Sequence, residues 1–195
     1  MKTRILIAAS LLSLGSFASA QVFDWENLGL GNFSSVSQTV SGITATGTGV
    51  GGTIDVLDFG SFTNFSTFGT RSIVGGGDPR VAIRVDFSID LTLLTVQFGD
   101  IGVDDDGTVT VTAYNSSNAV VDTNSMNYGL MDRPASLTLS APDISYFIGV
   151  SGGPFPNTLV WDNMTVTPVP EPATMIALLA GVSALVARRR RKSAA

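Results

Sequence analysis

The residue types in this chain restrict its chemistry to oxygen donors and acceptors. Its 195 residues include no histidine and no cysteine. Zinc centres, thiol nucleophiles and histidine-assisted serine nucleophiles each depend on one of those residues. Gly149–Gly153 matches the Gly-x-Ser-x-Gly pattern of hydrolases, but the chain has no histidine base and Pro154 interrupts the helix that must follow. We therefore assign no catalytic residue and expect a protein that is not an enzyme.

Carboxylates are the remaining reactive groups, and one set of them precedes Gly107. Asp100 and Asp104–Asp106 form an oxygen-rich segment of the kind that calcium prefers. The spacing is not that of an EF-hand loop, because Gly102 and Ala113 would occupy the first and last ligand positions. A hairpin turn at Asp106-Gly107 with solvated carboxylates is the favoured alternative. Asp104 and Asp106 are kept as candidate calcium ligands.

A second pair of acids, Glu26 and Asp162, lies near the two ends of the central region. Pairing of the first strand with the last, which is common in β-sandwiches of the jelly-roll type, would bring these two side chains together. The pattern loosely resembles carbohydrate-binding modules with a jelly-roll fold, and that resemblance implies a structural Ca²⁺ at these acids. Two acids facing water remain the alternative. No carboxylate pair stands out for glycoside hydrolysis, although the many aspartates leave that reaction open.

Aromatic side chains supply a further hypothesis, since sugar rings stack on exposed aromatic faces. Trp25, Trp161 and Tyr114 are the candidate platforms for binding an exopolysaccharide. Phe59, Phe62, Phe65 and Phe68 recur every third residue. That spacing does not match the period of two in a strand, so we expect a loop that closes one end of the core.

These residues must be positioned by strands, because alternation of apolar and polar residues dominates the central region. No twelve-residue stretch there has helical periodicity. We predict an all-β fold, an antiparallel β-sandwich of about ten strands and most plausibly a jelly roll. The expected strands are Val22–Leu28, Val36–Thr46, Thr53–Phe59, Val81–Phe87, Leu91–Phe98, Thr108–Tyr114, Ala119–Asn127, Ser136–Leu139, Ile144–Val150 and Leu159–Thr167.

The beginning of the chain has the composition of a secretory signal peptide. Lys2 and Arg4 precede an apolar segment that ends in Ala18-Ser19-Ala20. A positive start, a short apolar core and small residues at the end are typical of a cleaved export signal. We predict cleavage after Ala20, and hence a signal peptide over residues 1–20.

The last 28 residues contain three different segments in a fixed order. Pro170, Glu171 and Pro172 interrupt the chain, the apolar run 173–187 follows, and a basic cluster ends it. Proline prevents a continuous helix or central strand, whereas an apolar run forms a helix in lipid. Fifteen helical residues span about 22 Å, which is short for a bilayer core of roughly 30 Å. The cluster expected to stay cytoplasmic consists of Arg188, Arg189, Arg190, Arg191 and Lys192.

This order resembles the PEP-CTERM sorting signal of bacterial exosortase substrates. The resemblance implies that Pro-Glu-Pro is the processing motif and that the helix holds the precursor briefly in the inner membrane. It also implies an exosortase-type processing enzyme as a partner and delivery to the cell surface or outside. We therefore expect three parts: the signal peptide 1–20, a β-sandwich domain 21–167 and the sorting tail 168–195.

Loss of both ends changes the charge of the protein. Residues 21–170 contain four arginines, no lysine and fifteen acids, so their net charge is −11, compared with −5 for the whole chain. Such a surface argues against nucleic-acid partners, because phosphates need compensating cations. The preferred function is a non-catalytic surface or extracellular-matrix protein of a biofilm. The alternative is a lectin-like module that binds exopolysaccharide.

Overall fold

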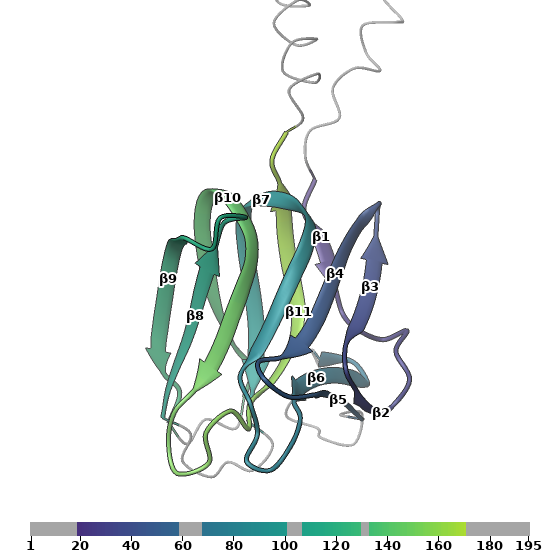
Figure 1. Cartoon of the computed structure of the whole chain (residues 1–195), viewed down its shortest axis with the longest axis vertical. Helices are drawn as coiled ribbons and strands as arrows, with labels where there is room; N and C mark the ends of the chain where they lie inside the picture. Colours follow the sequence, from purple (N-terminus) through teal and green to yellow (C-terminus); the bar gives the residue numbers. More distant parts are fainter. Residues whose placement is uncertain (1–18, 59–67, 101–106, 130–132, 171–195) are drawn as a thin grey trace, which may run out of the picture. The chain divides into compact units, whose positions relative to one another are not determined.

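Antiparallel strands form the framework of the folded region (Figure 1). The computed structural model describes residues 19–58, 68–100, 107–129 and 133–170, and Ala20–Val169 form one compact unit. The strands are β1 (Gln21–Phe23), β2 (Gly31–Phe33), β3 (Val36–Val40), β4 (Ile43–Gly49), β5 (Ile54–Asp58), β6 (Arg71–Gly75), β7 (Ile83–Gly99), β8 (Thr108–Tyr114), β9 (Val120–Asn127), β10 (Ala135–Ser151) and β11 (Val160–Pro168).

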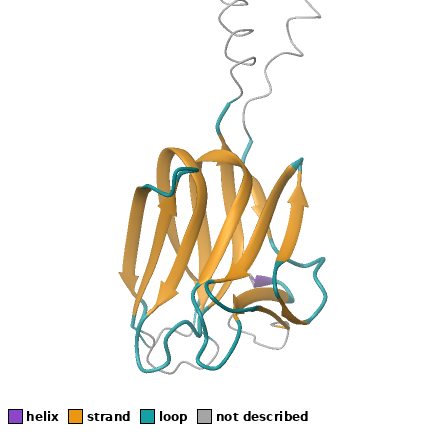
Figure 2. Ribbon diagram, in the orientation of Figure 1, coloured by secondary structure: helices purple, strands orange, loops and turns teal. Residues whose placement is uncertain are grey.

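Two long strands connect the two layers of the sandwich. The first half of β7 and the second half of β10 lie in one layer, whose strand order is β3-β4-β7-β10-β8-β9. Their other halves join the second layer, in the order β2-β5-β6-β11-β7-β10, with β1 beside β11. Figure 2 shows both strands bending over one end of the domain. The bend coincides with shifts in register on both sides of Ile144, as expected where strands change layer.

The core lies between the layers and is rich in aromatic side chains. Phe98 contacts Trp161 with ring centroids 5.5 Å apart, and Phe147 packs on the same tryptophan at 6.5 Å. A Cβ atom added to Gly149 would stand only 2.6 Å from the Trp161 ring. Gly149 is therefore required so that β10 can approach this ring.

Side chains of the outer strands β9 and β3 hydrogen-bond to backbone groups of neighbouring segments. On one side, Asp122 of β9 accepts a hydrogen bond from the Ser140 backbone N–H (2.7 Å), and Asn124 donates to the Thr138 carbonyl (3.0 Å). On the other, Gln38 of β3 accepts from the Trp25 N–H (3.1 Å). The two bonds to β10 satisfy backbone groups that would otherwise be open to pairing with another chain, whereas the bond from Trp25 ties the turn after β1 to β3.

The predicted fold class is confirmed: the described residues form an antiparallel β-sandwich of the jelly-roll type. The strand boundaries differ, because β7 and β10 each unite two predicted strands, while Val36–Thr46 contains a turn. The hairpin predicted at Asp106-Gly107 is wrong, because β10 lies between β7 and β8. Phe68 is buried in a small cluster with Val74 and Val160, whereas Phe59, Phe62 and Phe65 lie outside the described residues.

Candidate functional site

Pairing of the first and last strands confirms the expected closure of the domain. Gln21 of β1 lies opposite Val166 of β11, and Phe23 lies opposite Met164. The chain then turns at Trp25, whose φ of 57° is in the left-handed region, while β11 is irregular at Asn163, where φ is 42°. These two irregularities place the acids of both segments in one region of the domain.

Asp162 is the most strongly perturbed acid of that region. Its side chain is fully buried, and its carboxylate accepts hydrogen bonds from the Ser72 hydroxyl (3.0 Å) and the Asn163 backbone N–H (2.7 Å). Burial raises the pKa of Asp162 to about 8, and the negative charges of Glu26 and Asp24 add to the increase. The two hydrogen bonds favour the charged form but are outweighed. At neutral pH the isolated domain therefore holds a proton on Asp162.

Glu26 connects the first segment of the domain to the segment before β6. Its Oε1 accepts hydrogen bonds from the backbone N–H groups of Thr70 (2.6 Å) and Arg71 (3.0 Å), and its Oε2 accepts from the Thr70 hydroxyl (2.5 Å). The carboxylate lies against Gly69, where an added Cβ would come within 2.1 Å of Oε1. The observed role of Glu26 is to hold the residues that precede β6.

The calcium hypothesis is not decided by this geometry. Within the ranges described, no three acidic side chains are close enough together to hold a metal ion. The negative charge of Glu26 raises the pKa of Asp162, and both carboxylates already accept protein hydrogen bonds. Asp104 and Asp106 lie outside the described residues. Calcium binding at these four acids stays a prediction.

Two of the three proposed sugar platforms lie in the core. Trp25 is 0% exposed and Trp161 is 2% exposed, so neither can present its face to a sugar. That part of the expectation is wrong, because both side chains fill the space between the layers. Tyr114 differs: it ends β8 on the outer face and is half-buried.

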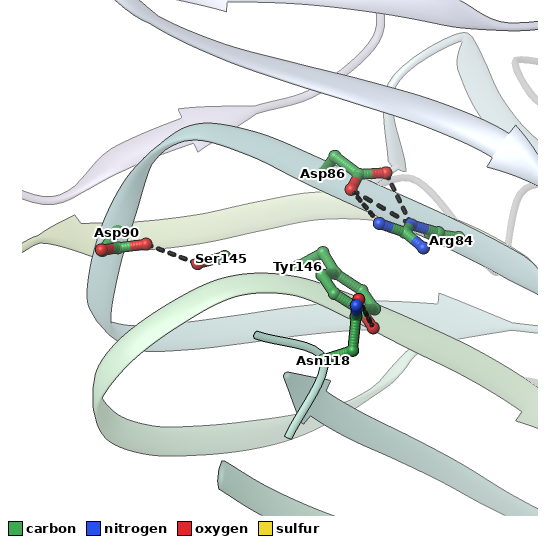
Figure 3. A network of polar contacts seen from close by, with 6 residues as sticks. All are labelled: Arg84, Asp86, Asp90, Asn118, Ser145 and Tyr146. Atoms are coloured by element: carbon green, nitrogen blue, oxygen red, sulfur yellow. Dashed lines mark hydrogen bonds and ion pairs between the residues drawn. The ribbon is translucent and has the colours of Figure 1, made fainter. Parts of the chain in front are cut away.

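Tyr114 belongs to a stack of side chains that crosses three strands. Its ring lies parallel to that of Tyr146, with centroids 4.8 Å apart and 6° between the planes. The guanidinium carbon of Arg84 stands 3.7 Å from the Tyr146 ring centroid. Figure 3 shows the polar side of this group, in which the Tyr146 hydroxyl donates to Asn118 (3.0 Å) and Arg84 pairs with Asp86. That hydrogen bond to Asp86 raises the pKa of Arg84.

The Gly-x-Ser-x-Gly match is a structural feature of β10. Ser151 is buried, and its hydroxyl accepts a hydrogen bond from the Asn157 backbone N–H (2.9 Å). Asn157 in turn accepts from the Ser151 N–H (3.2 Å), which fixes the following loop. No strand-to-helix turn exposes this serine, since β10 ends at Ser151 and residues 152–159 form bends and turns without a helix.

The tail begins where the folded unit ends. β11 ends at Pro168, and the Val169 N–H donates to the carbonyl of Asp90 (3.0 Å). Pro170 is exposed, whereas Glu171, Pro172 and the basic residues 188–192 lie outside the described ranges. At the other end of the chain, Ala20 is described and Ala18 is not.

A comparison with protein families decides what the tail is. Residues 168–192 match the family described as the PEP-CTERM protein-sorting motif. The tail carries a PEP-CTERM motif. No curated protein matches the chain.

Several solved structures are similar to the sandwich domain. An arabinose-bound α-L-arabinofuranosidase matches with 14% identity over 79% of this chain, a TM-score of 0.42, and only 27% of its own length covered. A DUF4465 family protein from Bacteroides caccae has 12% identity and a TM-score of 0.48, with 77% and 99% of the two chains covered. A family 29 carbohydrate-binding module has 12% identity and a TM-score of 0.34, with 77% and 92% covered. These similarities concern the fold alone.

The PEP-CTERM motif establishes how the protein is delivered. It identifies an exported protein that is anchored transiently in the membrane and processed by an exosortase-type enzyme. The part of the chain that the structure describes has no helix with the length and hydropathy of a membrane span. The apolar run 173–187 lies outside that part.

The sequence did not reveal the polar residues beside the tyrosine stack or those beside the acids Asp24 and Asp162. Arg84 and Asp86 alternate with buried residues of β7 and read only as the polar face of a strand. Gln38, whose amide donates to Asp24 (2.7 Å), carries no local signal either. Their contacts depend on which strands become neighbours, and a single sequence does not reveal that order.

Proposed function

We propose that this PEP-CTERM protein is a non-catalytic component of the bacterial surface or extracellular matrix, contributing to the architecture of a biofilm. The observation that supports this function is the combination of a sorting tail with a compact, strongly acidic sandwich domain. The chain supplies neither histidine nor cysteine for catalysis, and the serine of its Gly-x-Ser-x-Gly segment is buried at the end of β10.

Replacement of the sorting motif tests delivery and role together. In the producing bacterium, changing Glu171 and Pro172 to alanine should leave the protein in the membrane fraction and deplete it from the matrix. Loss of matrix cohesion in this strain and in a deletion strain supports an architectural role. Unchanged matrix in the deletion strain, or turnover of a polysaccharide by the purified domain, contradicts it.

The stack of Tyr114, Tyr146 and Arg84 favours a second function, the binding of an exopolysaccharide. Tyr146 is covered on its faces by its two neighbours, whereas Tyr114 keeps part of its surface open. An aromatic ring held flat by a parallel partner loses little conformational entropy on binding. Tyr114 would therefore supply the stacking surface, and Arg84 and Asp86 the polar contacts beside it.

A substitution at Tyr114 tests this second function. Tyr114→Ala should abolish saturable retention of the purified domain on exopolysaccharide from the producing strain. Val22→Ala is the matched control, since this 47% exposed side chain lies on β1, which pairs with β11 and not with the strands of the stack. Retention that is equal in all three proteins, or absent in the unsubstituted domain, contradicts a lectin-like role.

A further inference from the structure

The folded domain continues to the residue before the processing motif. The Thr92 hydroxyl donates to the Thr167 carbonyl (3.2 Å), and Pro168 lies opposite Leu91. The Val169 N–H then donates to the carbonyl of Asp90 (3.0 Å). Each of the last three residues before Pro170 is therefore in register with, or hydrogen-bonded to, β7.

This attachment limits the distance between the motif and the domain. Only two peptide units separate Val169 from Glu171, and each spans at most about 3.6 Å. The Cα of Glu171 is thus never more than about 7 Å from that of Val169. An enzyme that binds the motif and the residues on both sides of it must either contact the end of the domain or break the bonds that hold Thr167–Val169 to β7.

The two segments that meet at this point, residues 89–93 of β7 and the end of β11, carry three partly exposed apolar side chains and an exposed acid. Ile89 is 41% exposed, and Leu93 and Val169 are each 37% exposed. The exposed Asp90, whose carbonyl accepts from the Val169 N–H, also accepts a hydrogen bond through its carboxylate from the Ser145 hydroxyl (2.5 Å) (Figure 3). We call Ile89, Asp90, Leu93 and Val169 the exit surface.

We propose that the exosortase-type enzyme binds the exit surface together with the Pro-Glu-Pro motif, and so recognises the folded end of the domain as part of its substrate. This proposal rests on the sorting function of the tail. Single exposed aliphatic residues are ordinary on protein surfaces. What distinguishes Ile89, Leu93 and Val169 is that covalent geometry brings them to the enzyme whenever the motif is bound.

Pulse–chase labelling of the full-length precursor in the producing bacterium tests the proposal. The paired change Ile89→Ser and Leu93→Ser should slow conversion of precursor to product about tenfold, the effect of losing a substantial interface contact. Val120→Ser is the control, because it removes a more exposed aliphatic side chain elsewhere. Protease resistance of each precursor establishes that the domain is folded.

Insertion of six Gly and Ser residues between Val169 and Pro170 separates docking from simple access. The insertion keeps motif and surface intact but removes the covalent limit on their separation, so it should also slow processing. Conversion of the Ile89/Leu93 variant at the normal rate, or faster conversion of the insertion variant, overturns the proposal. Failure of the sorting function looks different, because the Glu171/Pro172 variant would then be processed normally.

Discussion

Asp162 shows how one buried side chain can make the stability of the domain depend on pH. Its pKa is about 8 in the folded state, far above the ordinary value of 3.8. The proton therefore stabilises the fold fully below pH 3.8, and this contribution is lost as the pH rises through 8. Between pH 5 and 7 the free energy of unfolding should fall by roughly 1 kcal/mol per pH unit from this group.

Asp162→Asn should remove that dependence, because asparagine has the same shape but cannot ionise, and its amide oxygen can still accept from the Asn163 N–H while its NH2 can donate to the Ser72 hydroxyl. Urea denaturation of both proteins at several pH values measures the difference. The variant should be the more stable protein above pH 8 and lose its advantage under acidic conditions. Parallel pH profiles for the two proteins would contradict a protonated Asp162.

The calcium hypothesis predicts a different result for the same carboxylate. A bound cation would replace the proton, and its binding to the native state would raise the melting temperature. In that case millimolar calcium should raise the melting temperature at pH 8 in the unsubstituted domain and much less in Asp162→Asn. If calcium leaves the melting temperature unchanged, Glu26 and Asp162 are not metal ligands.

The close packing of Trp161 on Gly149 can be tested by adding one methyl group to the glycine. Gly149→Ala places a methyl group against the indole ring, and overpacking of this kind costs about 1–3 kcal/mol. Gly152→Ala is the matched control, since its added Cβ would have no neighbour closer than 3.7 Å. Urea denaturation should show a large loss of stability for the first variant and little for the second.

The sequence predicts the bounds of a strand correctly where the whole strand stays in one layer of the sandwich. β8 has the predicted bounds, because Val109, Val111 and Ala113 face the core without interruption. β7 and β10 read as two strands each, since they change layer and their alternation fails at Ser88–Asp90 and around Pro142. β6 lacks the alternation of apolar and polar residues, because both of its faces are buried. Ile73 packs in the main core, whereas Val74 lies on the other face with Phe68 and Val160.

The candidate sites were less predictable than the strands. Pairing of β1 with β11 was expected, and it brings Glu26 close enough to Asp162 to influence its charge. The tryptophans could not be assigned, because an indole is equally common in a core and at a binding surface. The sorting tail was readable because its signal is local and needs no fold.

The edge strand β9 carries its own protection against pairing with other chains. Asp122 and Asn124 bond the backbone of β10, and each also accepts from the backbone N–H of the next residue of β9 (2.8 and 2.9 Å). Replacing both by alanine should cost about 1–3 kcal/mol in total and leave an edge that recruits other chains. Ser125→Ala on the same strand is the control.

Denaturation and light scattering together measure that effect. The double variant should unfold at lower urea concentration and scatter light on storage, whereas Ser125→Ala should do neither. A double variant that loses stability without aggregating would show that the bonds hold the layers together but do not protect the edge.

At the scale of the whole molecule, the processed domain is defined by unbalanced negative charge. Arg71, Arg80 and Arg84 each pair with a nearby aspartate, namely Asp58, Asp55 and Asp86. Exposed pairs of this kind stabilise a fold only slightly. Because residues 21–170 contain only four arginines against fifteen acids, these pairs leave a large excess of negative charge, which repels itself.

Screening of that repulsion should stabilise the domain. We expect residues 21–170, expressed alone, to fold and to melt several degrees higher at 0.5 M than at 0.02 M sodium chloride, because the Debye length falls from about 20 Å to about 4 Å. A variant with several exposed, unpaired aspartates changed to asparagine should show a smaller salt effect. A melting temperature that falls with added salt would mean that the three ion pairs outweigh the repulsion. The acidic surface would then contribute to the stability of the delivered protein rather than reduce it.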